Sequence, residues 1–110
     1  MAENPEIRSG ENIGDDLIAM QETHIFIVGD LILDAYILGK VTRISPEAPV
    51  PVVLEQNQWT VLGGAANVAA NVASFGGSAY LAGRVGQDHD GKQFLGLCKD
   101  LGIDTSAVVI

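Results

Sequence analysis

A glycine pair followed by small residues and an asparagine is the part of the sequence best suited to chemistry. Gly63 and Gly64 precede two alanines and Asn67, whose amide can both donate and accept hydrogen bonds. Glycines let main-chain N–H groups come close to a ligand, and a helix starting here adds a partial positive charge of roughly half a unit. The pattern indicates a ligand site. Tight packing of a small-residue helix on a sheet explains it equally well.

Two aspartates follow a short apolar run upstream of the glycines. Asp30 and Asp34 lie just after residues 24–28, where the end of a buried strand is expected. A carboxylate accepts hydrogen bonds from two neighbouring hydroxyls at once, which suits a ligand that carries adjacent hydroxyls. Both aspartates are therefore candidate ligand residues, although for Asp30 a role in the turn is an equally good interpretation.

Arg43 is the candidate for a phosphate contact. It stands before the proline-containing stretch 45–51, in an acidic chain with few cations. A guanidinium group offers a planar fork of donors that matches a phosphate better than an ammonium does. An arginine that only faces solvent is an equal alternative.

The glycine segment as a whole resembles a known signature. Residues 63–69, with Gly76 and then Gly86 at their spacings, are similar to the first signature of the ribokinase-like (PfkB-type) carbohydrate kinases. The resemblance implies that Asn67 and the preceding glycines hold sugar hydroxyls. It also implies that Asp34 matches the family's sugar-binding aspartate after the first strand.

Residues 43–53 resemble the lid of one subgroup, the bacterial heptose 7-phosphate kinases. This resemblance implies phosphorylation of D-glycero-D-manno-heptose 7-phosphate at its anomeric carbon during lipopolysaccharide core assembly, often beside an adenylyltransferase domain. Lids of the family pair between subunits, so a homodimer through residues 43–62 is expected. Tyr36 and Trp59 fit either that interface or the lid core.

The catalytic parts of such a kinase are expected elsewhere. Family members transfer phosphate with a later Gly-Ala-Gly-Asp loop, which this sequence does not contain. The resemblance therefore implies that ATP and Mg²⁺ serve the full-length enzyme, and that this chain alone binds neither and is inactive. It covers about the first third of a typical family member, which predicts a truncated kinase domain.

Three other functions are weighed against this one. A dinucleotide-dependent oxidoreductase also begins with strand, glycines and helix, but residues 63–64 lack the third glycine of G-x-G-x-x-G. A non-catalytic sugar-binding or dimerising remnant would bind without turning over ATP. Another PfkB sugar kinase, of the ribokinase or fructokinase type, would differ only in substrate.

The order of elements predicts an α/β protein, namely the N-terminal portion of a ribokinase-like doubly wound sheet with a small antiparallel β lid. Residues 1–22 are expected to be a polar extension, loose over 1–12, with a weak helical pattern at 13–21. Residues 23–110 are expected to form the kinase portion, with the lid at about 35–62. Strands are predicted at 24–28, 31–38, 41–44, 50–55, 59–62, 78–85 and 107–110, and helices at 65–74 and 88–101.

Because two or three short strands are marginal alone, the lid is expected to lie against something else. The exposed sheet edges of a partial domain predict association with other chains.

Composition excludes several classes of partner. The chain has 110 residues, is 47% hydrophobic and 18% charged, and carries a net charge of -8. Nucleic acid and anionic membranes both require clustered cations, so neither is expected. No apolar run approaches ~20 residues and no signal peptide is recognisable, and a single cysteine fits a reducing, cytoplasmic location.

The remaining polar candidates have simpler interpretations. His24 and His89 lie far apart without a partner at metal-ligand spacing, so no metal site is predicted. Cys98 falls on the apolar stripe of a predicted helix and is expected in the core. Asp88 is expected to cap the start of that helix.

Overall fold

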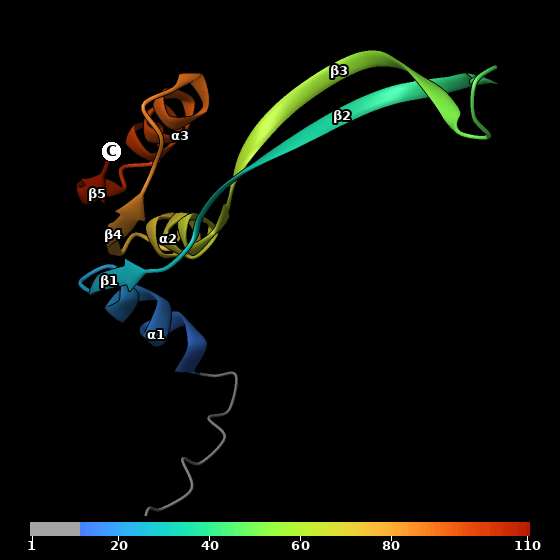
Figure 1. Cartoon of the computed structure of the whole chain (residues 1–110). Helices are drawn as coiled ribbons and strands as arrows, with labels where there is room; N and C mark the ends of the chain where they lie inside the picture. Colours follow the sequence, from blue (N-terminus) through green and yellow to red (C-terminus); the bar gives the residue numbers. More distant parts are fainter. Residues whose placement is uncertain (1–11) are drawn as a thin grey trace, which may run out of the picture.

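A computed structural model describes residues 12–110 of the chain as an α/β body from which a long β-hairpin projects (Figure 1). The loose tail was expected over residues 1–12, of which residues 1–11 lie outside the described residues. The elements, in order, are α1 (Ile13–Met20), β1 (His24–Val28), β2 (Leu31–Ile44), β3 (Pro51–Gly64), α2 (Ala65–Ser74), β4 (Ser78–Arg84), α3 (His89–Asp100) and β5 (Asp104–Val109).

The body is a parallel sheet of order β1-β4-β5, with α2 and α3 as its crossovers. The sheet grows in one direction along the chain, and the buried side chains of both helices join a single core with Leu81 of the central strand. The nine buried hydrophobic residues are Leu62, Ala66, Ala69, Val72, Ala79, Leu81, Phe94, Cys98 and Ile103. An α/β fold with a parallel sheet and an antiparallel pair is thus confirmed.

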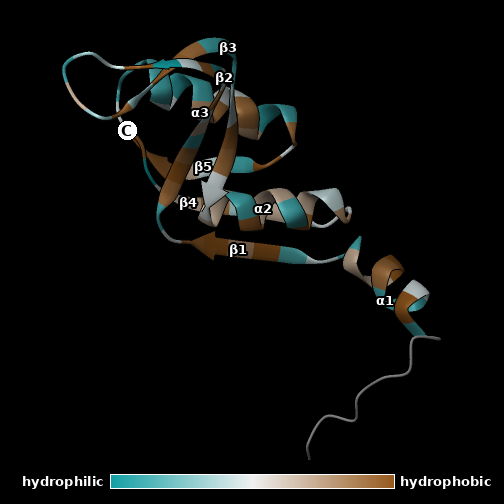
Figure 2. Cartoon of the chain, turned by 90° about the vertical axis from the view of Figure 1, so that its right-hand side faces the viewer, coloured by the Kyte–Doolittle hydropathy of each residue, from teal (hydrophilic) through white to brown (hydrophobic). Residues whose placement is uncertain are grey.

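The other face of the sheet is apolar but open. Strand alternation puts Phe26 and Tyr80, which are partners in the register, on the face opposite Leu81. Phe26 is 62% and Val28 70% exposed, and Figure 2 shows β1 as a strongly apolar strand. Within the described residues, helices α2 and α3 therefore cover only one face of this sheet.

Strands β2 and β3 pair antiparallel along their whole length, from Leu31 opposite Gly64 to Ile44 opposite Pro51. We call this hairpin, residues 31–64, the arm; at 14 residues a strand it is about 45 Å long. Within residues 31–64, only Leu62 and Gly63 are buried, both at the root where the arm joins the body.

The arm differs from the predicted lid in two ways. Four short strands were expected, but each side is one continuous strand, with register shifts at Leu38/Gly39 and at Val41/Arg43. Gly39 is not a turn: a Cβ there would overlap the Val53 side chain and lie 2.7 Å from the Leu54 carbonyl oxygen. The lid was also expected to lie against a larger sheet, a ligand or a second subunit; among residues 12–110, no larger sheet covers the arm beyond its root, where most of its residues are exposed.

The helices agree closely with expectation. Helix α2 has the predicted bounds, and Gly76, at φ +86°, follows its end. Helix α3 begins after Asp88, whose Oδ1 accepts a hydrogen bond from the Gly91 N–H at 2.8 Å, as predicted for a cap. Strand β5 begins at Asp104, three residues before the predicted start.

No helix among residues 12–110 has the length and apolar character needed to cross a membrane.

Candidate functional site

The glycine pair lies at the junction of the arm and α2, in a backbone conformation that only glycine adopts easily. Gly64 has φ 57° and ψ -135° and directly precedes the helix. A Cβ on Gly64 would lie 2.5 Å from the Asp30 carbonyl oxygen. That oxygen accepts a hydrogen bond from the Ala65 N–H at 2.9 Å, which ties the end of β1 to the start of α2. Asp30 therefore contributes its main chain to this junction, and its side chain is exposed.

Gly63 provides the space that the Asp34 carboxylate occupies. Asp34 is opposite Val61 in the arm register, so its side chain shares a face with the neighbouring pair Ile32 and Gly63. A Cβ built on Gly63 would overlap Asp34 Oδ2 and lie 3.0 Å from Asp34 Cγ. The carboxylate is half-buried, and no group among residues 12–110 donates a hydrogen bond or forms an ion pair with it. Its oxygens remain available to accept from a ligand.

The start of α2 adds uncapped N–H groups beside this carboxylate. Its N-cap residue, Gly64, has no side chain to accept from the first-turn amides. Asn67, in that first turn, is exposed and lines a cleft of about 290 Å³ between β3, α2 and α3. Val61, the partner of Asp34, lines the same cleft. The structure therefore places the Asp34 carboxylate against Gly63, whereas Asn67 lines a cleft to which Asp34 does not contribute.

The last glycine of the signature builds a second hollow, at the carboxyl end of β4. A Cβ on Gly91 would overlap the Gly86 carbonyl oxygen, so the loop packs closely on the start of α3. The hollow measures about 190 Å³ and is lined by Leu31, Leu33, Arg84, Val85, Gly86, Asp88, Asp90, Gly91 and Phe94. Sequence analysis did not predict a site at Arg84 and Asp90. Their position at the carboxyl end of a parallel strand, where ligands commonly bind, was the signal that could have indicated one.

Arg43 lies far from this junction. It is nine residues beyond Asp34 on the same strand, a separation of about 30 Å, and it is exposed near the tip of the arm. Within one chain, Arg43 and Asp34 therefore do not bind the same small molecule.

The minor candidates are structural. His24 Nδ1 lies 3.2 Å from the Tyr80 hydroxyl, and the two rings stack. Cys98 is fully buried, and burial raises the pKa of its thiol to about 11. In the part of the chain from residue 12 onward, no three His, Cys, Asp or Glu side chains gather as a metal site would require.

Residues 22–110 match the family described as pfkB family carbohydrate kinase. The chain belongs to this family. Its matched region contains both strands of the arm, the glycine junction and the entire parallel sheet. The resemblance inferred from residues 63–69 is thereby confirmed.

Curated relatives of this chain carry the name bifunctional protein HldE. The protein of Methylobacillus flagellatus is 55% identical over 84 residues, which are 76% of this chain and 17% of the relative. That of Helicobacter pylori strain J99 is 51% identical over 86 residues, 78% of this chain and 19% of the relative. The chain thus spans less than a fifth of the length of these relatives.

Solved structures of carbohydrate kinases share the fold. A structure assigned as a ribokinase from Agrobacterium tumefaciens superposes with a TM-score of 0.64 at 31% identity, covering 81% of this chain and 28% of its own. A fructokinase from Xylella fastidiosa gives a TM-score of 0.58 at 26% identity, covering 78% of this chain and 24% of its own. The predicted ribokinase-like fold class is confirmed.

Proposed function

We propose that this chain is the sugar-binding N-terminal portion of an ATP-dependent kinase that phosphorylates D-glycero-D-manno-heptose 7-phosphate at its anomeric carbon. The HldE name of the relatives and the heptose-kinase-like segment 43–53 support the substrate. ATP and Mg²⁺ would act in the full-length enzyme, where they supply the phosphoryl group and neutralise its charge. The single cysteine suits a cytoplasmic enzyme.

The observation that carries the proposal is the Asp34 carboxylate seated on Gly63. It is half-buried, lacks an intramolecular donor among the described residues, and lies beside the start of α2. Sugar hydroxyls would replace the water on its oxygens, while N–H groups of the first helical turn and the Asn67 amide would donate to other sugar oxygens. Asp34 and Asn67 would thus bind the substrate; this chain is proposed to hold no catalytic base.

The test is calorimetric titration of the chain with heptose 7-phosphate. Asp34→Asn should weaken binding by about 10- to 100-fold, since hydrogen bonds to a charged group contribute about 1.5–3 kcal/mol. Asp30→Asn is the matched control, because the contact seen for Asp30 uses its main-chain oxygen, and it should bind within about 3-fold of the parent. Equal losses in both variants, or no loss in Asp34→Asn, would contradict the proposed site.

The ribokinase and fructokinase neighbours favour a second candidate substrate class. Titrating the chain with ribose and with fructose, in parallel with heptose 7-phosphate, decides which of these sugars it binds most tightly. ATP added to the saturated chain separates a binding portion from a complete kinase, since the proposal expects no sugar phosphate product from the chain alone.

We also propose that the arm mediates a homodimer. Large apolar side chains stand exposed along it, including Ile37 at 61%, Leu54 at 60% and Ile44 at 68%. Pairing with a second arm would cover them, and it would bring Arg43 toward a phosphate bound on the other subunit. Sedimentation of the parent against Ile44→Asp tests this: the variant should be monomeric at concentrations where the parent is dimeric.

A further inference from the structure

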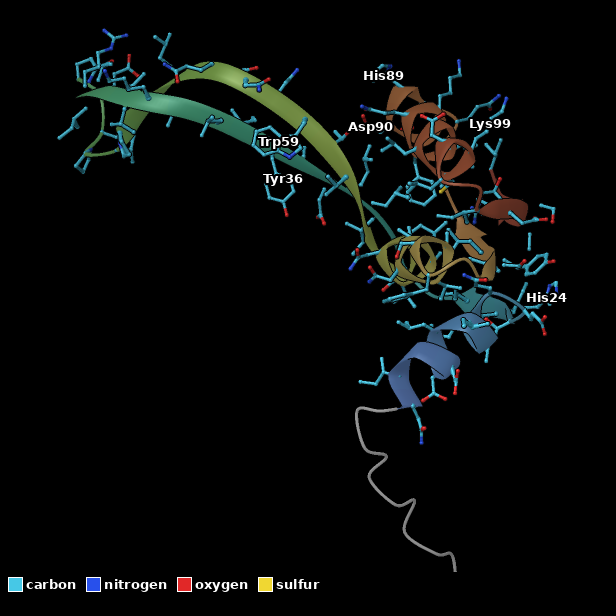
Figure 3. The ribbon with its side chains drawn as sticks, turned by 180° about the vertical axis from the view of Figure 1, so that it is seen from behind. His24, Tyr36, Trp59, His89, Asp90 and Lys99 are labelled. Atoms are coloured by element: carbon cyan, nitrogen blue, oxygen red, sulfur yellow. The ribbon has the colours of Figure 1, made fainter. Side chains whose placement is uncertain are left out.

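The root of the arm carries an aromatic pair on the same face as Asp34. In the register, Tyr36 is opposite Trp59, two positions along the arm from the pair of Asp34 and Val61. Side chains two residues apart on a strand share a face, so both rings lie on the Asp34 side. Figure 3 shows Tyr36 and Trp59 on the concave side of the arm. Both residues also contribute to a cleft of about 340 Å³ between the arm and α3, which His89, Asp90 and Gln93 line from the helix.

The two rings stack on each other, and the outer sides of the pair remain accessible. Their centroids are 5.6 Å apart and their planes differ by 11°, so they stack. Tyr36 is 48% and Trp59 46% exposed. Core aromatics are normally covered, and within residues 12–110 no other ring stacks on either of these. Almost half of this pair is therefore free to meet another molecule.

The spacing places the rings within reach of whatever Asp34 binds. Asp34 and Tyr36 are about 7 Å apart along β2, and Asp34 and Trp59 are diagonal neighbours at about 7 to 8 Å, within reach of an aromatic side chain. A sugar presents hydroxyls at its edge and C–H groups on its ring face. A carboxylate beside an aromatic surface is complementary to both at once.

We propose that the Tyr36–Trp59 pair is a sugar-stacking platform, which holds the C–H face of a substrate whose hydroxyls bind Asp34. This inference rests on the proposed function and extends it, because it assigns substrate contacts to two residues outside the glycine signature. It predicts preference for a six-membered ring over a smaller one, since the larger ring covers more of the platform. Pairing of the same rings with a second copy is the competing use.

Trp59 is the only tryptophan of the chain, so its fluorescence reports directly on the platform. Heptose 7-phosphate should change Trp59 emission in a saturable way, with the same midpoint as calorimetry. Tyr36→Ala should weaken binding by about 10-fold, whereas Tyr36→Phe, which keeps the stack, should remain within about 3-fold. Tyr80→Ala is the matched control, because it removes a stacked tyrosine from the body and should leave affinity unchanged.

The outcomes separate this inference from the function beneath it. Calorimetric binding that depends on Asp34, without a Trp59 signal and without an effect of Tyr36→Ala, would overturn the platform and leave the proposed function standing. Absence of binding in calorimetry would overturn both. A Trp59 signal that follows protein concentration instead of sugar, and that disappears together with the dimer in Tyr36→Ala, would assign the rings to a subunit contact and also overturn the platform.

Discussion

The body and the arm are built from similar residues but are stabilised differently. In the body, side chains from two helices and three strands converge on Leu81, which is fully buried. In the arm, apolar residues of comparable size such as Leu54 stay more than half exposed. Hydrogen bonds between its two strands define the arm, whereas apolar burial defines the body. The candidate site lies where the two meet, so it combines a rigid junction with an adaptable surface.

The largest contrast is expected from one leucine in each region. Leu81→Ala should lower the free energy of unfolding by about 2 to 5 kcal/mol, because it leaves a cavity in the central strand. Leu54→Ala, the same change in the arm, should alter it by less than about 0.5 kcal/mol. Urea denaturation followed by circular dichroism measures both. Similar values for the two would show that the arm is buried in solution.

The junction itself is tested by two glycines. Gly64→Ala should cost about 1 to 3 kcal/mol, because it forces a side chain into a left-handed conformation against the Asp30 carbonyl. Gly96→Ala is the control within α3, where a Cβ has no neighbour within 4 Å, and it should stabilise by about 0.5–1 kcal/mol. If Gly64→Ala melts like the parent, the junction is not the rigid element described.

High pH should destabilise the body through Cys98. Its pKa is raised by burial from 9.0 to about 11, so the folded state keeps the thiol proton that the unfolded chain releases. Stability is therefore complete below pH 9 and falls as the pH rises toward 11, by roughly 1 to 1.5 kcal/mol at pH 10. Cys98→Ala should lack this pH-dependent loss of stability. Denaturation curves of both proteins at pH 8 and pH 10 measure it as the change in unfolding free energy between the two pH values. Equal pH slopes for both proteins would contradict it.

The smallest effect concerns the link between the regions. Gln93 Nε2 of α3 donates a hydrogen bond to Thr60 Oγ1 of the arm at 2.7 Å. A double-mutant cycle of Gln93→Ala and Thr60→Val should give a coupling of about 0.5 to 1.5 kcal/mol. Zero coupling would mean that the root of the arm is held by Leu62 and the glycine junction without this contact.

Local chemistry made the body predictable from sequence. The bounds of α2 followed from Gly64 before it and Gly76 after it, and the start of α3 followed from the cap at Asp88. The start of strand β5 was predicted three residues too late because the first residues of this strand are polar. Asp104 accepts hydrogen bonds from the Ser106 hydroxyl and the Ser106 N–H, a local contact that is typical of a turn. These hydrogen bonds also lower the pKa of Asp104.

The arm and the site contacts were less predictable, because they depend on pairing across a long loop. Gly39 and the polar residues 55–58 resemble chain breaks, yet the register shift at Leu38/Gly39 lets the ladder continue. Asp34 and Gly63 were each predicted as candidate site residues, but their direct contact depends on a register spanning 29 residues. No local pattern specifies such a register.

The register shifts have a further consequence for how such an arm can diversify. Side chains along a strand point alternately to the two faces of the hairpin. An insertion of one residue therefore moves every later side chain to the opposite face, whereas an insertion of two residues does not. The irregularities at Leu38/Gly39 and Val41/Arg43 absorb an odd residue within the outer arm. The tip can therefore change in length and composition while Asp34 still faces Gly63, so new partners at the tip can evolve without disturbing the contact between these two residues at the root.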